Sequence, residues 1–382
     1  MPTASPETIV IGAGIIGASI AWKLARAGVS VTLIDAGLMG GEASWAGAGM
    51  LAPGGEVQSR DVWSALAIES HRLYPDYVAA LQNESGVPID FRRCGSVEVA
   101  FDQAEWQALT DRAAQQVPLG ITSQPLDQQT IRCHVPGFQR EIAGALFYSG
   151  DAIVDPRDIM RALRAACSAA GVRILESWRV AEIRVSPQGI SVGNDRGDRM
   201  QAHSAVLAAG AWSSQIPISG MPLPDLPKAF PVKGCLTGYR LEPGSLSPIL
   251  RHGHTYLLQR SNGFTIGGTT SEDRGFNRSV DDAVVGEITA RVNHLLPWLS
   301  AHRPSTAWVG FRPAAEAPGP VIHRLGDSCL WLAYGHYRNG ILLAPVTAQL
   351  VSREICGARD IASPAPLTSN CETGSPSTGA HR

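Results

Sequence analysis

The first 35 residues alternate between short apolar runs and one longer helical stretch. Residues 8–11 and 29–34 are apolar runs of strand length, and residues 18–27 between them have the composition of a buried helix. Short apolar runs of this kind predict strands that are buried on both faces, as in a parallel sheet. The pattern therefore predicts a βαβ unit at the start of the chain.

The same reading of hydrophobic periodicity predicts the remaining elements. Helical spacing covers residues 59–85, with an interruption near Pro75, and residues 103–116, 156–170, 281–295 and 341–355. Strand patterns cover residues 94–101, 172–175, 180–185, 189–192, 205–212, 231–241, 255–259, 264–268, 309–313 and 329–333. Asp155 and Pro156 are residue types preferred at a helix start, so residues 152–175 are expected to form a second βαβ-type crossover.

Apolar, glycine-marked segments flank strand-rich ones, which predicts an α/β fold with two domains. A Rossmann-type dinucleotide-binding domain is expected from residues 1–55, 148–215 and 308–357. A substrate-binding α+β domain with a mostly antiparallel sheet is expected from residues 56–147 and 216–307, with the proline-rich residues 221–227 as a linker. Residues 358–382 contain few large apolar side chains, and we expect a disordered tail.

A glycine motif, Gly12-Ala13-Gly14-Ile15-Ile16-Gly17, joins the first strand to the first helix. In dinucleotide-binding proteins the first glycine permits a tight turn, the second lets the backbone approach a pyrophosphate, and the third lets the helix pack on the strand. Asp35 ends the next strand, where a carboxylate accepts hydrogen bonds from ribose hydroxyls. The strand, helix and acid together favour a dinucleotide site over a glycine-rich turn without a ligand.

Composition excludes several other classes of protein. With 44% hydrophobic residues the chain of 382 residues buries a large core, and its net charge of −2 gives no sign of a nucleic-acid or membrane partner. The N-terminal residues do not resemble a signal peptide, and no run is long enough to cross a bilayer. Seven dispersed cysteines without a CxxC pair predict reduced thiols in a cytoplasmic protein. No metal site is predicted, since only His252 and His254 lie close together.

Two glycine-bounded segments near the end of the chain carry arginines. Arg312 lies in Gly310-Phe311-Arg312-Pro313, and Arg338 lies in Gly335-His336-Tyr337-Arg338-Asn339-Gly340, which opens the last predicted helix. A guanidinium group binds a carboxylate through two parallel hydrogen bonds, so both arginines are candidates for a carboxylate clamp. The alternatives are a structural ion pair for Arg312 and a surface position for Arg338. No covalent nucleophile is evident, which assigns the chemistry to a cofactor.

These motifs, together with the small-residue stretch Ala43–Ala52, resemble those of FAD-dependent glycine oxidases of thiamine biosynthesis (ThiO-like). These enzymes belong to the D-amino-acid oxidase and sarcosine oxidase group. The resemblance covers about residues 7–356 and is most specific in the segment from Gly335 to Ile341. It implies a homo-oligomeric flavoprotein that transfers hydride from glycine or another small amine to flavin N5. The expected products are glyoxylate, ammonia and, with molecular oxygen as the electron acceptor, hydrogen peroxide.

The resemblance also implies roles for individual residues. Arg312, Tyr256 and Arg338 would form the substrate pocket, and Arg312 would hold the substrate carboxylate. Since no cysteine is present near Gly310, we expect FAD to bind non-covalently. The residues expected to bind FAD are Gly12, Gly14, Ile15, Ile16, Gly17, Asp35, Ala36, Ser44, Ala48, Gly49, Met50, Val180, Ala209, Gly210, Trp212, His336, Arg338, Asn339, Gly340, Ile341 and Leu342.

Three other functions stay open at this point. One is a D-amino-acid or secondary-amine dehydrogenase, as in sarcosine oxidation, that passes electrons to a quinone or a partner protein. Another is an NAD(P)-dependent dehydrogenase, which the glycine motif alone would equally allow. The third is a flavin-binding subunit of a larger complex, as in hydrogen cyanide synthases. His252 and His254 match the family loosely, and substrate choice could differ there.

Overall fold

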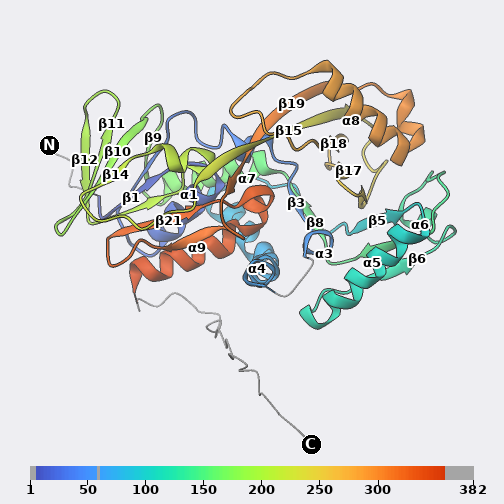
Figure 1. Cartoon of the computed structure of the whole chain (residues 1–382), viewed down its shortest axis with the longest axis horizontal. Helices are drawn as coiled ribbons and strands as arrows, with labels where there is room; N and C mark the ends of the chain where they lie inside the picture. Colours follow the sequence, from blue (N-terminus) through green and yellow to red (C-terminus); the bar gives the residue numbers. More distant parts are fainter. Residues whose placement is uncertain (1–5, 58–60, 358–382) are drawn as a thin grey trace, which may run out of the picture.

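The computed structural model describes residues 6–57 and 61–357. The disordered tail expected at residues 358–382 therefore lies outside the described residues. Within them, a Rossmann-type domain carries an inserted α+β part with a large, mostly antiparallel sheet, as the sequence predicts (Figure 1).

A six-stranded sheet organises the part of the molecule at the left of Figure 1. Its strand order is β20-β21-β13-β1-β2-β9, and only β20 runs antiparallel to its neighbour. The predicted opening βαβ unit is confirmed, because β1 and β2 are parallel neighbours and helix α1 (Ile15–Arg26) connects them along the chain. The strands are β1 (Thr8–Ile11), β2 (Val31–Ile34), β9 (Arg173–Leu175), β13 (Ser204–Leu207), β20 (Val321–Arg324) and β21 (Leu330–Tyr334).

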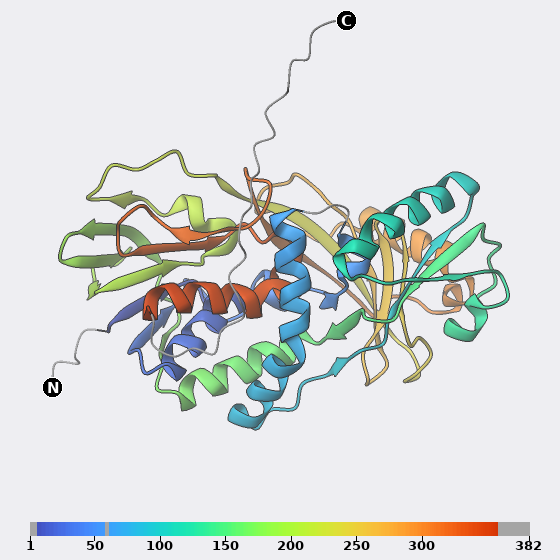
Figure 2. The ribbon, with the colours of Figure 1, turned by 90° about the horizontal axis from the view of Figure 1, so that it is seen from below.

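Side-chain alternation along β1 supplies two cores, one on each face of this sheet. Val10 packs among the helices α1 (Ile15–Arg26), α7 (Pro156–Ala169) and α9 (Gly340–Cys356), which lie close together in Figure 2. Ile9 and Ile11 face a four-stranded sheet of order β12-β11-β10-β14. Its strands are β10 (Val180–Ser186), β11 (Gly189–Asn194), β12 (Arg199–Ala202) and β14 (Ile218–Ser219). The first two pair antiparallel, and both were predicted as strands.

Helix α4 (Val62–Ser85) differs from the prediction in two respects. It continues through Pro75 without the expected interruption. It also packs against α7 and α9, so that Leu66, Tyr74 and Leu81 belong to the core of the dinucleotide-binding part and not to the substrate-binding part. The periodicity identified the buried face of this helix, but it carried no information about which neighbour covers that face.

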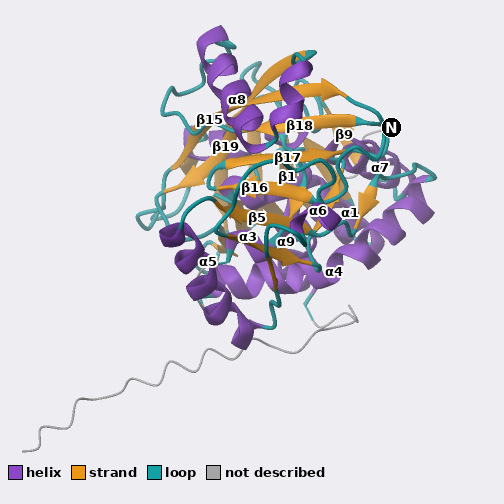
Figure 3. Cartoon of the chain, turned by 90° about the vertical axis from the view of Figure 1, so that its right-hand side faces the viewer, coloured by secondary structure: helices purple, strands orange, loops and turns teal. Residues whose placement is uncertain are grey.

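An eight-stranded sheet of order β19-β15-β18-β17-β16-β5-β7-β6 forms the other half of the molecule. Figure 3 shows β15, β18, β17, β16 and β5 one below the other in this order, with α8 above and α5 below. The bounds are β5 (Ser96–Ala100), β6 (Gln124–Leu126), β7 (Gly144–Tyr148), β15 (Ala229–Arg240), β16 (Ile249–His252), β17 (Thr255–Gln259), β18 (Phe264–Gly268), β19 (Thr306–Ala315), α5 (Gln103–Gln116), α6 (Ile131–His134) and α8 (Asp282–Leu295).

Strand β19 pairs with β15 from Thr306 to Ala315, and this pairing places it in the eight-stranded sheet. The division expected above assigns residues 308–315 to the dinucleotide-binding domain, so the structure differs there. The difference arises because the partner of a strand is set by contacts distant in sequence. Arg312 consequently projects from the substrate-binding sheet.

A small antiparallel sheet joins the two halves. Its strands are β3 (Met50–Leu51), β8 (Ala152–Val154) and β4 (Phe91–Arg92), in the order β3-β8-β4. Asp155 caps α7 as predicted, because its carboxylate accepts a hydrogen bond from the Arg157 amide at 2.9 Å. The predicted second βαβ crossover is nevertheless wrong: β8 and β9 lie in different sheets.

Short helices complete the described chain: α2 (Ala43–Ala46), α3 (Pro53–Glu56), η1 (Val117–Leu119), η2 (Gly210–Gln215), η3 (Pro297–Ala301) and η4 (Tyr337–Asn339). The six cysteines in the described ranges form no disulfide. Across residues 6–57 and 61–357, no helix has the length and apolar character needed to cross a membrane.

Candidate active site

The glycine motif forms a tight connection between β1 and α1 whose shape depends on two glycines. Gly12 has φ +100°, and a side chain there would collide with the carbonyl of Ala208. A side chain at Gly17 would collide with the carbonyl of Gly12. The start of α1 is thereby held against β1, and Gly14, Ile15 and Ile16 line the cavity.

Asp35 lies at the end of β2 and contacts the motif directly. Its Oδ2 accepts a hydrogen bond from the Ala13 amide at 2.7 Å, and its Oδ1 accepts one from the Gly37 amide at 2.8 Å. Burial raises the pKa of this carboxyl, and the two amide hydrogen bonds act in the opposite direction. Asp35 therefore orders the glycine loop and also lines the cavity.

One elongated cavity of about 630 Å³ brings the candidate residues together. Every residue predicted to bind substrate or cofactor lines it except Gly17 and Leu342. Gly17 lies behind the loop, as its close approach to Gly12 shows. Leu342 is buried in α9, where its carbonyl accepts a hydrogen bond from the Ser70 hydroxyl at 2.6 Å.

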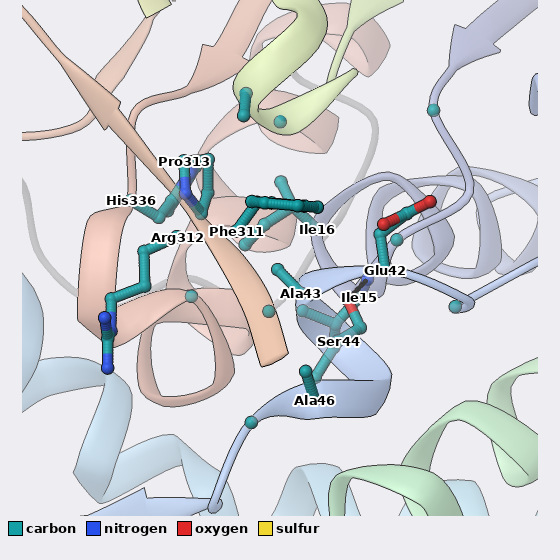
Figure 4. Close-up of a pocket in the computed structure, with 18 of the residues that line it drawn as sticks. Ile15, Ile16, Glu42, Ala43, Ser44, Ala46, Phe311, Arg312, Pro313 and His336 are labelled. Carbon is teal, nitrogen blue, oxygen red and sulfur yellow. Dashed lines mark hydrogen bonds between the residues drawn. The ribbon is translucent and has the colours of Figure 1, made fainter. Parts of the chain in front are cut away.

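Small residues allow separate segments to approach one another around the middle of the cavity. A side chain at Gly310 would lie 2.5 Å from Cβ of Ala46, and the indole of Trp308 donates a hydrogen bond to the Ala46 carbonyl at 3.0 Å. The Ser44 hydroxyl accepts a hydrogen bond from the Ile15 amide at 2.9 Å. In Figure 4 Phe311 points toward Ile16, whereas Arg312, the next residue along β19, points the opposite way.

Arg312 is held rigidly at one end of this cavity. Its Nη1 donates to the Thr270 carbonyl at 3.0 Å, and its Nη2 donates to the Thr269 hydroxyl at 2.8 Å. The guanidinium lies against Gly234 of the neighbouring strand, where any side chain would overlap it. Glycine at 234 therefore makes room for this arginine.

Tyr256 belongs to the same end of the cavity. Its side chain is only 6% exposed, and burial raises the pKa of its hydroxyl, so the hydroxyl stays a hydrogen-bond donor at neutral pH. The positive charges of Arg312 and Arg338, which line the same cavity, act to lower the pKa of this hydroxyl. A half-buried guanidinium and a buried phenol on one cavity wall form a site complementary to a small carboxylate.

Arg338 is paired with an acid that the sequence analysis missed. Its Nη2 donates to Oε1 of Glu56 at 3.0 Å, and Nη2 of Arg251 donates to the same oxygen at 3.3 Å. Glu56 lines the cavity, but no local sequence signal distinguished it from a surface acid. Arg338 is exposed, as the surface alternative considered above expects, but it is paired with Glu56 and also lines the cavity.

Glu42 and Arg278 are two further lining residues that the sequence analysis missed. They form a two-point ion pair with N–O distances of 2.6 and 3.0 Å, and Arg278 comes from the loop between β18 and α8. The same loop carries Phe276, which stacks on Trp212 at a centroid distance of 4.6 Å. The loop therefore joins the two halves of the molecule over the cavity.

The three histidines considered from the sequence have different environments. His336 lines the cavity but is 3% exposed, and burial lowers its pKa to about 3. Its Nε2 lies 3.0 Å from the Thr347 hydroxyl, so it is a neutral packing residue. His252 lies 2.9 Å from a Glu105 carboxylate oxygen, and His254 is exposed. Neither of the latter lines the cavity.

Comparisons with known proteins agree with this geometry. Residues 7–354 match the family model described as FAD dependent oxidoreductase (DAO). A glycine oxidase of Pseudomonas aeruginosa is 31% identical over 95% of this chain and 98% of its own length. A bifunctional protein ThiO/ThiG of Synechocystis is 34% identical over 91% of this chain, which spans 51% of that protein. The crystal structure of glycine oxidase from Geobacillus kaustophilus superposes with a TM-score of 0.85 at 28% identity, covering 92% of this chain and 94% of that one.

Proposed function

Since the chain belongs to the DAO family of FAD-dependent oxidoreductases, we propose that it oxidises glycine to glyoxylate and other small amines or amino acids to the corresponding carbonyl compounds. For glycine, water and molecular oxygen are consumed, and glyoxylate, ammonia and hydrogen peroxide are formed. The observation that carries this proposal is the pairing of a half-buried Arg312 with a buried Tyr256 on the wall of the cavity that the glycine motif also lines.

The described residues fit FAD. A dinucleotide needs close backbone approach, free N–H groups at a helix start and an elongated cavity, and the Gly12 loop and α1 supply the first two of these. Among the lining residues, Val180 and Gly210 would hold the adenosine part of FAD, and Met50, Gly340 and Ile341 would hold its flavin part. No cysteine is among the described residues that line the cavity, which supports non-covalent binding. When bound, FAD supplies the hydride acceptor.

Arg312 and Tyr256 orient the substrate in this proposal. The guanidinium forms two hydrogen bonds to the carboxylate, the Tyr256 hydroxyl donates a third, and the α-carbon is directed at the cofactor. Arg338 contributes a further positive charge at the same end.

The proton of the substrate ammonium is released to solvent before hydride transfer in this proposal. His336 is the one histidine among the described lining residues, and its burial and its contact with Thr347 make it unsuited to accept a proton at neutral pH. Catalysis then depends on orientation and on the neutral form of the amine.

The similar proteins also support a proposal about the metabolic role of this chain. Similarity to glycine oxidases and to a ThiO/ThiG protein supports a role in thiamine biosynthesis. The cytoplasmic location and the homo-oligomeric state stay predictions, and light scattering of the purified protein would measure the latter.

A spectroscopic experiment tests the proposed function. The purified holoenzyme is mixed with glycine without oxygen, and the visible flavin band is recorded before and after air is admitted. The proposal expects bleaching by glycine and recovery in air. A band that glycine leaves unchanged rejects glycine as substrate, and a band that recovers only with an added quinone identifies a dehydrogenase. A protein that cannot be reconstituted with FAD contradicts the flavoenzyme assignment.

A further inference from the structure

Glu56 is the acid at the substrate end of the cavity. The carboxylates among the described lining residues are those of Asp35, Glu42 and Glu56. Asp35 contacts the glycine loop and Glu42 precedes α2, whereas Glu56 pairs with Arg338 and acts electrostatically on Tyr256 and Arg312. A substrate held by Arg312 therefore has Glu56 as its acidic neighbour.

Two arginines share this single carboxylate. The side chains of Arg338, Glu56 and Arg251 are 29, 16 and 5% exposed, and both arginines donate to the same Glu56 oxygen. Nη1 of Arg251 is buried and has no hydrogen-bond partner among the described residues. Arg251 pairs with Tyr256 across β16 and β17, so it projects from the same face of the sheet as the tyrosine. Glu56 is thus the one carboxylate among the described residues that forms an ion pair with each of these two arginines.

The backbone that carries Glu56 is fastened on both sides. The Gln116 side chain donates to the carbonyls of Gly54 and Val57 at 2.8 and 2.6 Å. The Gly54 amide donates to the Asp151 carboxylate at 3.2 Å, and the Gly55 carbonyl accepts from Arg251 at 3.2 Å. The Glu56 carboxylate is therefore a fixed part of the site.

We propose that Glu56 is a specificity-determining residue that restricts the site to amino acids with one carboxylate. Its carboxylate occupies the position, between Arg251 and Arg338, that a second substrate carboxylate would need. The second carboxylate of a diacid is repelled by Glu56, whereas glycine has one carboxylate, whose charge Arg312 compensates. Neutralising Glu56 leaves two arginines without their partner, and these attract a second carboxylate. The identity of the substrate in this inference rests on the proposed function. The position of the Glu56 carboxylate rests on its contacts with Arg251 and Arg338.

The test compares the wild-type holoenzyme with Glu56→Gln, which keeps the shape and removes the charge. The rates kcat/KM are measured for glycine and for iminodiacetate, which carries two carboxylates on one amine. We expect the iminodiacetate-to-glycine ratio to rise by about tenfold or more in Glu56→Gln, the size typical of removing one close like charge. Glu69→Gln is the matched control, because Glu69 forms an exposed pair with Arg72 on α4 and its replacement should leave the ratio unchanged.

A binding measurement separates this inference from the proposed function. Acetate and malonate, with one and two carboxylates, are titrated against the holoenzyme, and the change in the flavin spectrum gives each dissociation constant. We expect Glu56→Gln to improve malonate binding relative to acetate, and the charge-preserving Glu56→Asp to keep the wild-type preference. If no amine is oxidised, the proposed function is rejected. The titrations still test the role of Glu56 in that case, because they measure binding and not turnover. An unchanged malonate-to-acetate ratio in Glu56→Gln, or a wild-type protein that already prefers the diacids, overturns the inference.

Discussion

The carboxylate of Asp35 accepts a hydrogen bond from the backbone amide of Ala13 at 2.7 Å. The end of β2 is thus tied to the middle of the glycine motif. Asp35 also lines the cavity proposed to hold FAD, so one side chain both orders the loop and borders the proposed cofactor site. A residue at the end of β2 is placed to do both, since this point lies next to the glycine motif and on the cavity wall.

Replacing Asp35 should weaken FAD binding and lower stability together. A buried amide that loses a charged partner costs about 1–3 kcal/mol, so Asp35→Ala should raise the dissociation constant of FAD by about tenfold or more. The measurements are FAD titration of the apoprotein and urea unfolding. Asp111→Ala removes an exposed acid from α5 and should change neither quantity. An Asp35→Ala protein with wild-type FAD affinity would show that Asp35 has no part in cofactor binding.

Removing Arg312 should lower catalytic efficiency strongly. A charge-assisted hydrogen bond contributes roughly 1.5–3 kcal/mol, so Arg312→Ala should lower kcat/KM for glycine by about ten- to a hundredfold or more. Arg312→Lys should recover little of the lost kcat/KM, because lysine lacks the planar group that forms two parallel hydrogen bonds to a carboxylate. Arg303→Ala, at an exposed position before β19, is the control. Unchanged turnover of glycine by Arg312→Ala would exclude Arg312 from the substrate site.

The pair of Glu42 and Arg278 should influence FAD affinity through charge compensation. Glu42 places a negative charge on the wall near the start of α1, and Arg278 neutralises it. Arg278→Ala should therefore weaken FAD binding by about three- to tenfold, a modest effect because the pair is largely exposed. The double variant Arg278→Ala, Glu42→Gln should recover most of the affinity. If the double variant binds FAD as weakly as Arg278→Ala, charge compensation is not the cause.

Asp151 should make stability depend on pH. Burial raises its pKa from 3.8 to about 6, while hydrogen bonds from Ser96 and Gly54 and the charge of Arg251 act against this rise. The folded state therefore binds a proton at Asp151 more tightly than the unfolded state does. The stability that this proton contributes is lost as pH rises from about 4 to above 6. We expect the free energy of unfolding of the wild type, relative to Asp151→Asn, to fall by up to about 3 kcal/mol over this interval. Urea unfolding at pH 4, 5, 6 and 7 measures it, and parallel curves for the two proteins would contradict the assignment.

The sequence by itself determined the dinucleotide unit and just under half of the residues that line the cavity. The glycine motif, Asp35 and the segments around Arg312 and Arg338 are local patterns, and their requirements are local too: a positive φ at Gly12 and small residues where backbones meet. The bounds of α5, β17 and β18 were also predicted correctly, because hydrophobic periodicity is fixed within each segment.

Only the tertiary structure decided which segments share a sheet and which charges meet. Helix α4 packs in the dinucleotide-binding core, and β19 belongs to the substrate-binding sheet. Strands β8 and β9 lie in different sheets. The same applies to Glu56, which is 282 residues from Arg338 and 195 from Arg251, and to Glu42, which is 236 from Arg278. A local pattern shows that a face is apolar or that an acid is present, but the partner is chosen by packing of the whole chain. The residues proposed here to set substrate choice could therefore be found only in the folded molecule.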